Sequence, residues 1–146
     1  MSDKYKLTDE TKEASGIKLF RIQALRSFVD VRAGDLGGWV EGVKNLSQDG
    51  DAWVHGDARV HGDARVLGDA WVYGNAWVFG SAQVYSDAQV FGNAQVYGDA
   101  RVYGDAQVFG DARVYGDARV YGNAWVHGDA RVSGDNLVLQ CSRSNA

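Results

Sequence analysis

The sequence G-D-A-R-V-Y at 98–103 is one copy of a six-residue unit, Gly-Asp-Ala-x-Val-x, which repeats from Asp51 to Leu139. An alanine stands two residues before each valine from Ala52 to Ala130, and Asn136 takes its place in the last unit. Self-similarity at a short fixed period is the signature of a repeat architecture. The valines of the repeat stand at 54, 60, 66, 72, 78, 84, 90, 96, 102, 108, 114, 120, 126, 132 and 138.

Each unit predicts a short extended strand followed by a tight corner. Residues two apart point to the same side of a strand, so the alanine and the valine share one side. Glycine adopts positive φ at little cost, and Asp or Asn tolerates a corner, so the pair between strands predicts a turn. Ser86 is the one residue that replaces the corner glycine within the repeat. One unit cannot bury its valine alone, whereas stacked units can.

Six residues per side resembles the hexapeptide solenoid, the left-handed parallel β-helix, in which three sides close one triangular coil. The resemblance implies an all-β fold of about five coils, spaced about 4.8 Å apart. We expect three parts: an N-terminal hairpin and capping segment at 1–50, the β-solenoid at 51–140 and a C-terminal tail at 141–146.

The N-terminal part predicts two strands, at 4–8 and 17–25, joined by a turn over 9–16. Leu46 is in phase with Ala52, so a degenerate first strand is expected there. An open solenoid end exposes unpaired backbone and valines, and we expect residues 1–50 to cover it.

A family resemblance lies in the runs V-R-A-G-D-L-G-G-W-V at 31–40 and N-L-S-Q-D-G-D-A-W-V at 45–54. These runs resemble the start of YdcK-type β-solenoid proteins, which occur in enterobacteria and, as similar short chains, in phages and prophages. The resemblance implies a short phage- or prophage-like member. The name of this family includes the word acetyltransferase, which rests on the solenoid fold and not on a defined active site.

Composition limits the classes of function. The net formal charge is −4, which makes nucleic-acid binding through phosphates unlikely. No long apolar run predicts a membrane span, and the N-terminus lacks an apolar signal core. Cys141 is the single cysteine, so no internal disulfide forms. We expect a cytoplasmic protein, in the host cytoplasm if a phage encodes it.

With three sides per coil, the outward residues form three faces, and one of them lacks charge. Such a strip predicts contact with a partner, although stacked aromatics can also be a purely structural ladder. Hexapeptide solenoids commonly form trimers with parallel axes, so we expect a homo-oligomer, with a trimer favoured. The uncharged face consists of Trp53, His55, Trp71, Tyr73, Gln89, Phe91, Gln107, Phe109, Trp125 and His127.

The other two faces carry arginine at six positions, always within the tripeptide Asp-Ala-Arg. The two charges lie on the same side of one strand, so we expect local charge compensation. A calcium ladder is the alternative, but calcium-binding Asp repeats have a period of about nine. No metal is therefore expected.

The candidate catalytic side chains within the repeat are three histidines, His55, His61 and His127. They cannot meet within one chain, and we expect them to end aromatic ladders. No loop interrupts the repeat to form a pocket, so we expect no catalytic residue and no cofactor. The favoured function is a non-catalytic interaction protein that self-associates. An acyltransferase-like enzyme with a site between subunits and a small-ligand or carbohydrate binding module remain alternatives.

Overall fold

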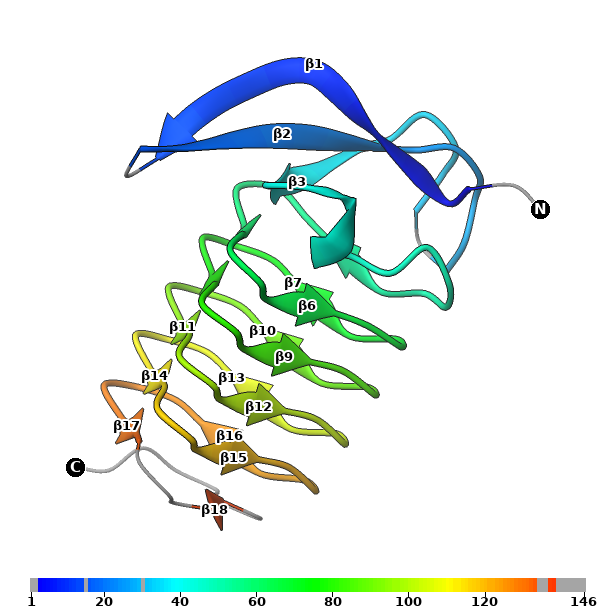
Figure 1. Cartoon of the computed structure of the whole chain (residues 1–146). Coiled ribbons are helices and arrows are strands. Elements are labelled where there is room, and N and C mark those ends of the chain that lie inside the picture. The colour runs from blue at the N-terminus through cyan, green and yellow to red at the C-terminus, as the bar shows by residue number, and fades with distance from the viewer. Residues whose placement is uncertain (1–2, 15, 30, 134–136, 139–146) are drawn as a thin grey trace.

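The computed structural model describes residues 3–14, 16–29, 31–133 and 137–138. It is a rod of stacked coils with a pair of antiparallel strands across its N-terminal end (Figure 1). Apart from the 3-10 helix η1 (Val43–Asn45), every regular element of the described residues is a β-strand. The all-β solenoid predicted from the repeat is confirmed.

Three parallel stacks of two-residue strands form the sides of the rod. Every strand pairs with the strand eighteen residues further on, as in Gln89 with Gln107 and Val90 with Val108. The uncharged face is built on β4 (Trp53–Val54), β7 (Trp71–Val72), β10 (Gln89–Val90), β13 (Gln107–Val108) and β16 (Trp125–Val126). The second face has β5 (Arg59–Val60), β8 (Trp77–Val78), β11 (Gln95–Val96), β14 (Arg113–Val114) and β17 (Arg131–Val132). The third face has β6 (Arg65–Val66), β9 (Gln83–Val84), β12 (Arg101–Val102), β15 (Arg119–Val120) and β18 (Leu137–Val138).

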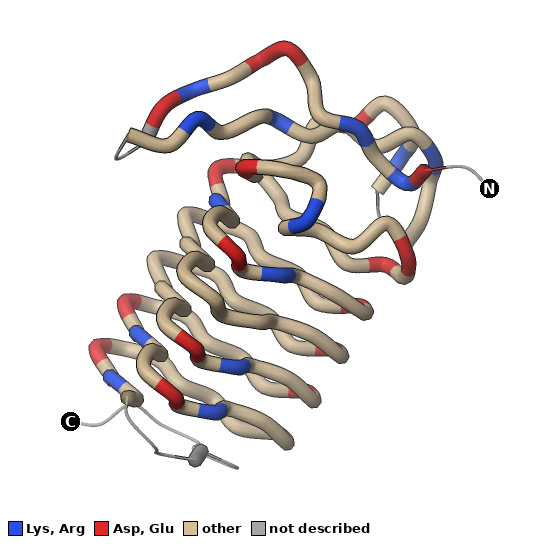
Figure 2. The backbone as a smooth tube through the Cα atoms, in the orientation of Figure 1, with Lys and Arg blue, Asp and Glu red and all other residues tan. Residues whose placement is uncertain are grey.

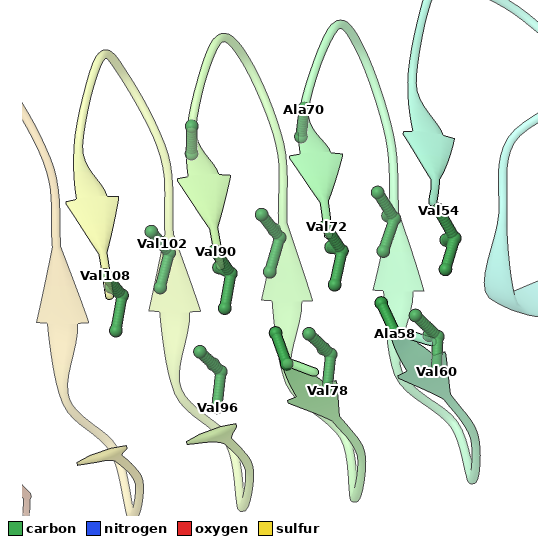
Figure 3. Close-up of a cluster of buried hydrophobic side chains, with 14 of the residues drawn as sticks. Val54, Ala58, Val60, Ala70, Val72, Val78, Val90, Val96, Val102 and Val108 are labelled. Atoms are coloured by element: carbon green, nitrogen blue, oxygen red, sulfur yellow. The ribbon is translucent and has the colours of Figure 1, made fainter. Parts of the chain in front are cut away.

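The alanines and valines of the repeat fill the centre of the rod. From Ala52 to Val120 each of them is fully buried. Figure 3 shows valines from successive coils, such as Val72, Val90 and Val108, lying in register. Small side chains suit this core because three strands converge on it in every coil.

Glycine is required at the corners for two reasons. Gly98 has a φ of 69°, which is in the left-handed region. A Cβ placed on it would also lie 2.8 Å from the backbone nitrogen of Gly116 in the next coil. Ser86 is the exception among these corners: its φ is 61°, and Asp87 beside it donates to the Gly104 carbonyl of the next coil at 2.9 Å, so one corner of this kind holds a side chain.

The N-terminal hairpin differs from the predicted one. β1 (Tyr5–Ala14) pairs antiparallel with β2 (Ile17–Ala24), and a register shift separates Leu7 from Thr11. The turn expected over 9–16 is wrong, because residues 9–14 continue the strand beyond this irregularity. β2 then pairs with β3 (Leu36–Val40), which pairs in parallel with β5 and so joins the hairpin to the second face.

The first coil is longer than the others. Val40 pairs with Val60, twenty positions later, and Leu46 bridges Val66 at the same separation. Val54 already pairs with Val72, eighteen positions later. Leu46 is buried, but it lies opposite a valine and not at the alanine position that its phase predicted. Two extra residues therefore lie between Leu46 and the corner at Gly50.

Lys4 lies at the start of the rod and is fully buried. Its Nζ donates to the backbone carbonyls of Ala52, Gly50 and Asp49, at 2.6, 3.4 and 3.5 Å. In later coils the glycine carbonyl of the corner accepts from the preceding coil, as Gly68 does from Asp51. The ammonium group thus satisfies carbonyls of the first coil, which have no preceding coil of the repeat. Burial lowers the pKa of Lys4 to about 8 from its ordinary value of 10.5.

We expect the free energy of unfolding to rise with pH between about 8 and 10. In this window the unfolded chain keeps a proton on Lys4 that the folded chain has released, because the folded pKa is the lower one. The slope from one group is at most about 1.4 kcal/mol per pH unit. Below pH 8 both states are protonated, and this contribution is flat.

Urea unfolding at a series of pH values up to 10 measures the slope. Above pH 10 Tyr5, whose pKa burial raises, acts in the opposite direction. The control is Lys4→Met, whose free energy of unfolding should rise less steeply with pH. Lys12 also has a lowered pKa, but it is present in both chains, so the difference between the two slopes reports on Lys4. Identical slopes in the two chains would contradict the assignment to Lys4.

Candidate functional site

The uncharged face presents one outward side chain before each valine. Trp71, Gln89 and Gln107 are half-buried, and Trp125 is 44% exposed. Trp125 is one of the few large apolar side chains of the described residues that lie open to solvent. The column therefore ends in an indole ring that is open to solvent.

Trp53 does not belong to this open column. Its side chain is 1% exposed. The rings of Tyr5 and Phe28 meet it edge-on, with centroids at 6.2 and 5.3 Å. The expectation that Trp53 lies on an open surface is wrong, because residues of the N-terminal segment cover it. The open part of the uncharged face begins at Trp71.

The side chains that follow the valines stack along the rod. Tyr73, Phe91, Phe109 and His127 form a ladder with successive centroid distances of 4.7, 4.9 and 5.1 Å. His55 meets Tyr73 edge-on at 6.0 Å. His55 and His127 thus stand at the two ends of one ladder, as predicted.

Equivalent ladders line the other two faces. On the second face His61, Phe79, Tyr97 and Tyr115 stack at 5.2, 4.9 and 5.1 Å. On the third, Tyr85, Tyr103 and Tyr121 stack at 4.9 and 5.2 Å. Aromatic stacking is thus common to all three faces and marks no site. What sets the uncharged face apart is the column before the valines.

On the other faces that column carries arginine. Arg65, Arg101, Arg113, Arg119 and Arg131 are exposed, and Arg59 lies over the ring of Trp77 at 5.1 Å. Figure 2 shows red and blue pairs on some coils, whereas the same places on other coils carry no charge, as at Gln83 and Gln95. In the described chain the ion pairs are Arg21 with Glu10 and Lys44 with Asp63. Compensation within Asp-Ala-Arg is therefore not seen as an ion pair, since these arginines extend into solvent.

A shallow depression of about 450 Å³ lies on the uncharged face, lined by His55, Trp71, Tyr73 and Gln89. Two hydrogen bonds fix its walls. The indole Nε1 of Trp71 donates to the Asp51 carbonyl at 3.2 Å, and the Tyr73 hydroxyl donates to Oε1 of Gln89 at 2.9 Å. Burial raises the pKa of Tyr73, so the hydroxyl keeps its proton at neutral pH. The depression is largely aromatic, and no carboxylate, ammonium or guanidinium group lines it.

The structure brings no catalytic set together among the described residues. His61 lies on a different face from His55 and His127, and burial lowers its pKa, which favours the neutral ring. No group of three or more His, Cys, Asp or Glu side chains gathers to hold a metal in the described part of the chain. Within the same residues, no helix is long and apolar enough to cross a membrane.

Sequence patterns missed two features beside the N-terminal segment. Trp39 lies under the Lys12 ammonium at 4.2 Å, with Arg21 at 5.6 Å from its ring. A second, more polar depression of about 540 Å³ lies where the first coil carries its extra residues, and Lys44, Gln48 and Arg65 are among its lining side chains. The break in the six-residue period after Leu46 is the signal that could have located it.

Comparison with known proteins identifies the repeat. The model of the family described as the YdcK beta solenoid repeat matches residues 70–86, 94–110, 106–118 and 112–128. No curated protein matches the chain. The matched stretches include Trp71, Gln107 and Trp125, and Gln89 lies between two of them.

Proposed function

We propose that this chain, whose residues 70–128 carry the YdcK beta solenoid repeat, is a non-catalytic interaction protein that self-associates through the uncharged face. One observation carries the proposal. The outward column Trp71, Gln89, Gln107 and Trp125 holds no ionisable group, whereas the same column on each of the other two faces holds arginine at three positions. Depletion of charge with enrichment of aromatics is the composition of an interface core.

The alternatives have less support. An acyltransferase-like site between subunits would need His55 or His127, and each of these rings is engaged in the aromatic ladder. The depression beside Trp71 supports a small uncharged ligand as a second candidate. Such a ligand would occupy the surface through which copies associate, so ligand binding and self-association would compete.

Arginine at Gln89 and Gln107 is expected to dissociate the oligomer. The repeat itself accepts arginine at this position, as Arg101 and Arg113 show, so the coil remains intact. Two like charges per copy would be desolvated against each other on association, which costs several kcal/mol. Multi-angle light scattering of Gln89→Arg/Gln107→Arg should give the mass of one chain.

The matched control is Gln83→Arg/Gln95→Arg, which makes the same change on the third and second faces. This control should keep the mass of the unaltered protein. A monomeric unaltered protein, or an oligomer that survives the Gln89→Arg/Gln107→Arg change, would refute the proposal.

A further inference from the structure

The open part of the uncharged face has the same order of residue types in both directions along the rod. Before the valines stand Trp71, Gln89, Gln107 and Trp125, so tryptophan is at both ends and glutamine at both inner positions. After the valines, the ladder has aromatic rings at each of the four heights. A surface with this order is self-complementary when one copy is reversed against another.

We infer that two copies pair face to face with antiparallel rod axes, about a two-fold axis that runs parallel to the strands between β10 and β13. The inference rests on the proposed self-association and specifies its geometry. A rotation about such an axis reverses the order of coils but keeps the order of residues along each strand. Trp71 then lies opposite Trp125 of the partner subunit, and Gln89 lies opposite Gln107 of the partner subunit.

The relief of the face fits this pairing. Trp125 is the exposed member of the column, at 44%, and its ring meets Phe109 edge-on at 6.1 Å. The depression walled by Trp71, Tyr73 and Gln89 is three coils away, or about 14 Å at the usual strand spacing. The antiparallel pairing sets Trp125 of each copy against the depression of the other. Both ends of the interface gain an aromatic contact of this kind.

The N-terminal segment also favours the antiparallel pairing. Tyr5 and Phe28 cover Trp53, so residues of this segment lie over the uncharged face at one end of the rod. Parallel rods, as in a three-fold trimer, would bring these coverings together at one height and hold the faces apart. In the antiparallel pair Trp53 lies one coil beyond β16 of the partner subunit. β16 is the last strand of the partner's uncharged face among the described residues, so no strand of that face lies opposite Trp53. The covering segments then flank the two ends of the interface.

The outward columns of this face hold no Asp, Glu, Lys or Arg, so the pairing desolvates no such side chain of these columns. Glutamine amides meeting across the two-fold axis can donate and accept in turn. Four open strands make a small surface, so we expect association in the micromolar range and not an obligate dimer. The experiment must therefore be run at about 0.1 mM protein.

Cross-linking between exposed corners tests the direction of the rods. Asn75 and Asp129 are exposed corner residues that occupy equivalent places beside Trp71 and Trp125. Chains carrying Asn75→Cys and chains carrying Asp129→Cys, both with Cys141→Ser, are mixed in equal amounts with one of them labelled with ¹⁵N. A short bis-maleimide then links close thiols, and mass spectrometry of the intact dimers identifies the chains in each.

The antiparallel pair predicts that links between positions 75 and 129 exceed links between like positions at least tenfold. Addition of Gln89→Arg/Gln107→Arg to both chains should abolish them. Links between like positions, or a trimeric mass in light scattering, would overturn the antiparallel pair and leave self-association through this face standing. A monomer at 0.1 mM (about 10²-fold above a micromolar Kd) would overturn both.

Discussion

Replacing Gly98 with alanine is expected to lower the free energy of unfolding by about 2–5 kcal/mol. Two costs combine at this corner. The φ of 69° places an alanine in the left-handed region, and its Cβ would lie 2.8 Å from the Gly116 nitrogen and 3.3 Å from the Gly116 Cα. Neither backbone atom can move without separating two coils that are hydrogen-bonded, as between Asp99 and the Gly116 carbonyl at 2.8 Å.

Gly56→Ala separates the two costs. Gly56 has a φ of 57°, but nothing lies within 4 Å of its ideal Cβ position. Only the backbone strain applies there, so we expect a loss of about 1–2 kcal/mol. Chemical unfolding followed by far-ultraviolet circular dichroism measures both variants. Equal losses at Gly98 and Gly56 would show that strain, and not the approach of the next coil, makes glycine necessary.

This corner illustrates why so much of the fold could be predicted from the sequence. The period of six places Gly98, Ala100 and Val102 in fixed relation, and each coil meets only its neighbours. The contacts that decide the rod are therefore local or repeat at one separation. Three units of six residues per coil predict the three faces and their outward columns, and the pairing of Gln89 with Gln107, eighteen residues apart, confirms this prediction.

The errors lie where contacts are neither local nor repeated. Trp53 follows the repeat perfectly, yet Tyr5 and Phe28 bury it from far away in the chain. The polar residues after Thr8 predict a turn, but pairing with β2 resumes at Thr11 and keeps them extended. A six-residue pattern contains no information about either contact.

The candidate site was predictable as a set of residues but not as a surface. Counting placed Trp71, Gln89, Gln107 and Trp125 in one column, and the structure keeps them there. Exposure differs along the face, because the N-terminal segment covers Trp53 at one end and Trp125 is open to solvent at the other. The ladders on all three faces also remove stacking as an argument for contact with a partner. What remains specific is the absence of charge.

Trp53→Ala is expected to cost about 3–5 kcal/mol, although an alignment of the repeats would place Trp53 and Trp125 at the same position. Trp53 is among the largest fully buried side chains of the described residues, and its ring joins the N-terminal segment to the first coil. Its removal leaves Tyr5 and Phe28 without a packing partner between them and the rod. Urea unfolding measures the total loss, and hydrogen exchange should show β1 and β2 losing protection before β10.

Trp125→Ala is the matched control, and both changes should be made in the Gln89→Arg/Gln107→Arg background so that the chain is monomeric. Because the Trp125 ring is 44% exposed and contacts Phe109 only by its edge, we expect a loss below about 1 kcal/mol. In the proposed dimer the order should reverse for association. Trp125→Ala should weaken it, because the Trp125 indole would face the partner subunit, whereas Trp53 would lie outside the paired surface. A similar cost in stability for the two tryptophans would mean that the N-terminal segment does not bury Trp53 in solution.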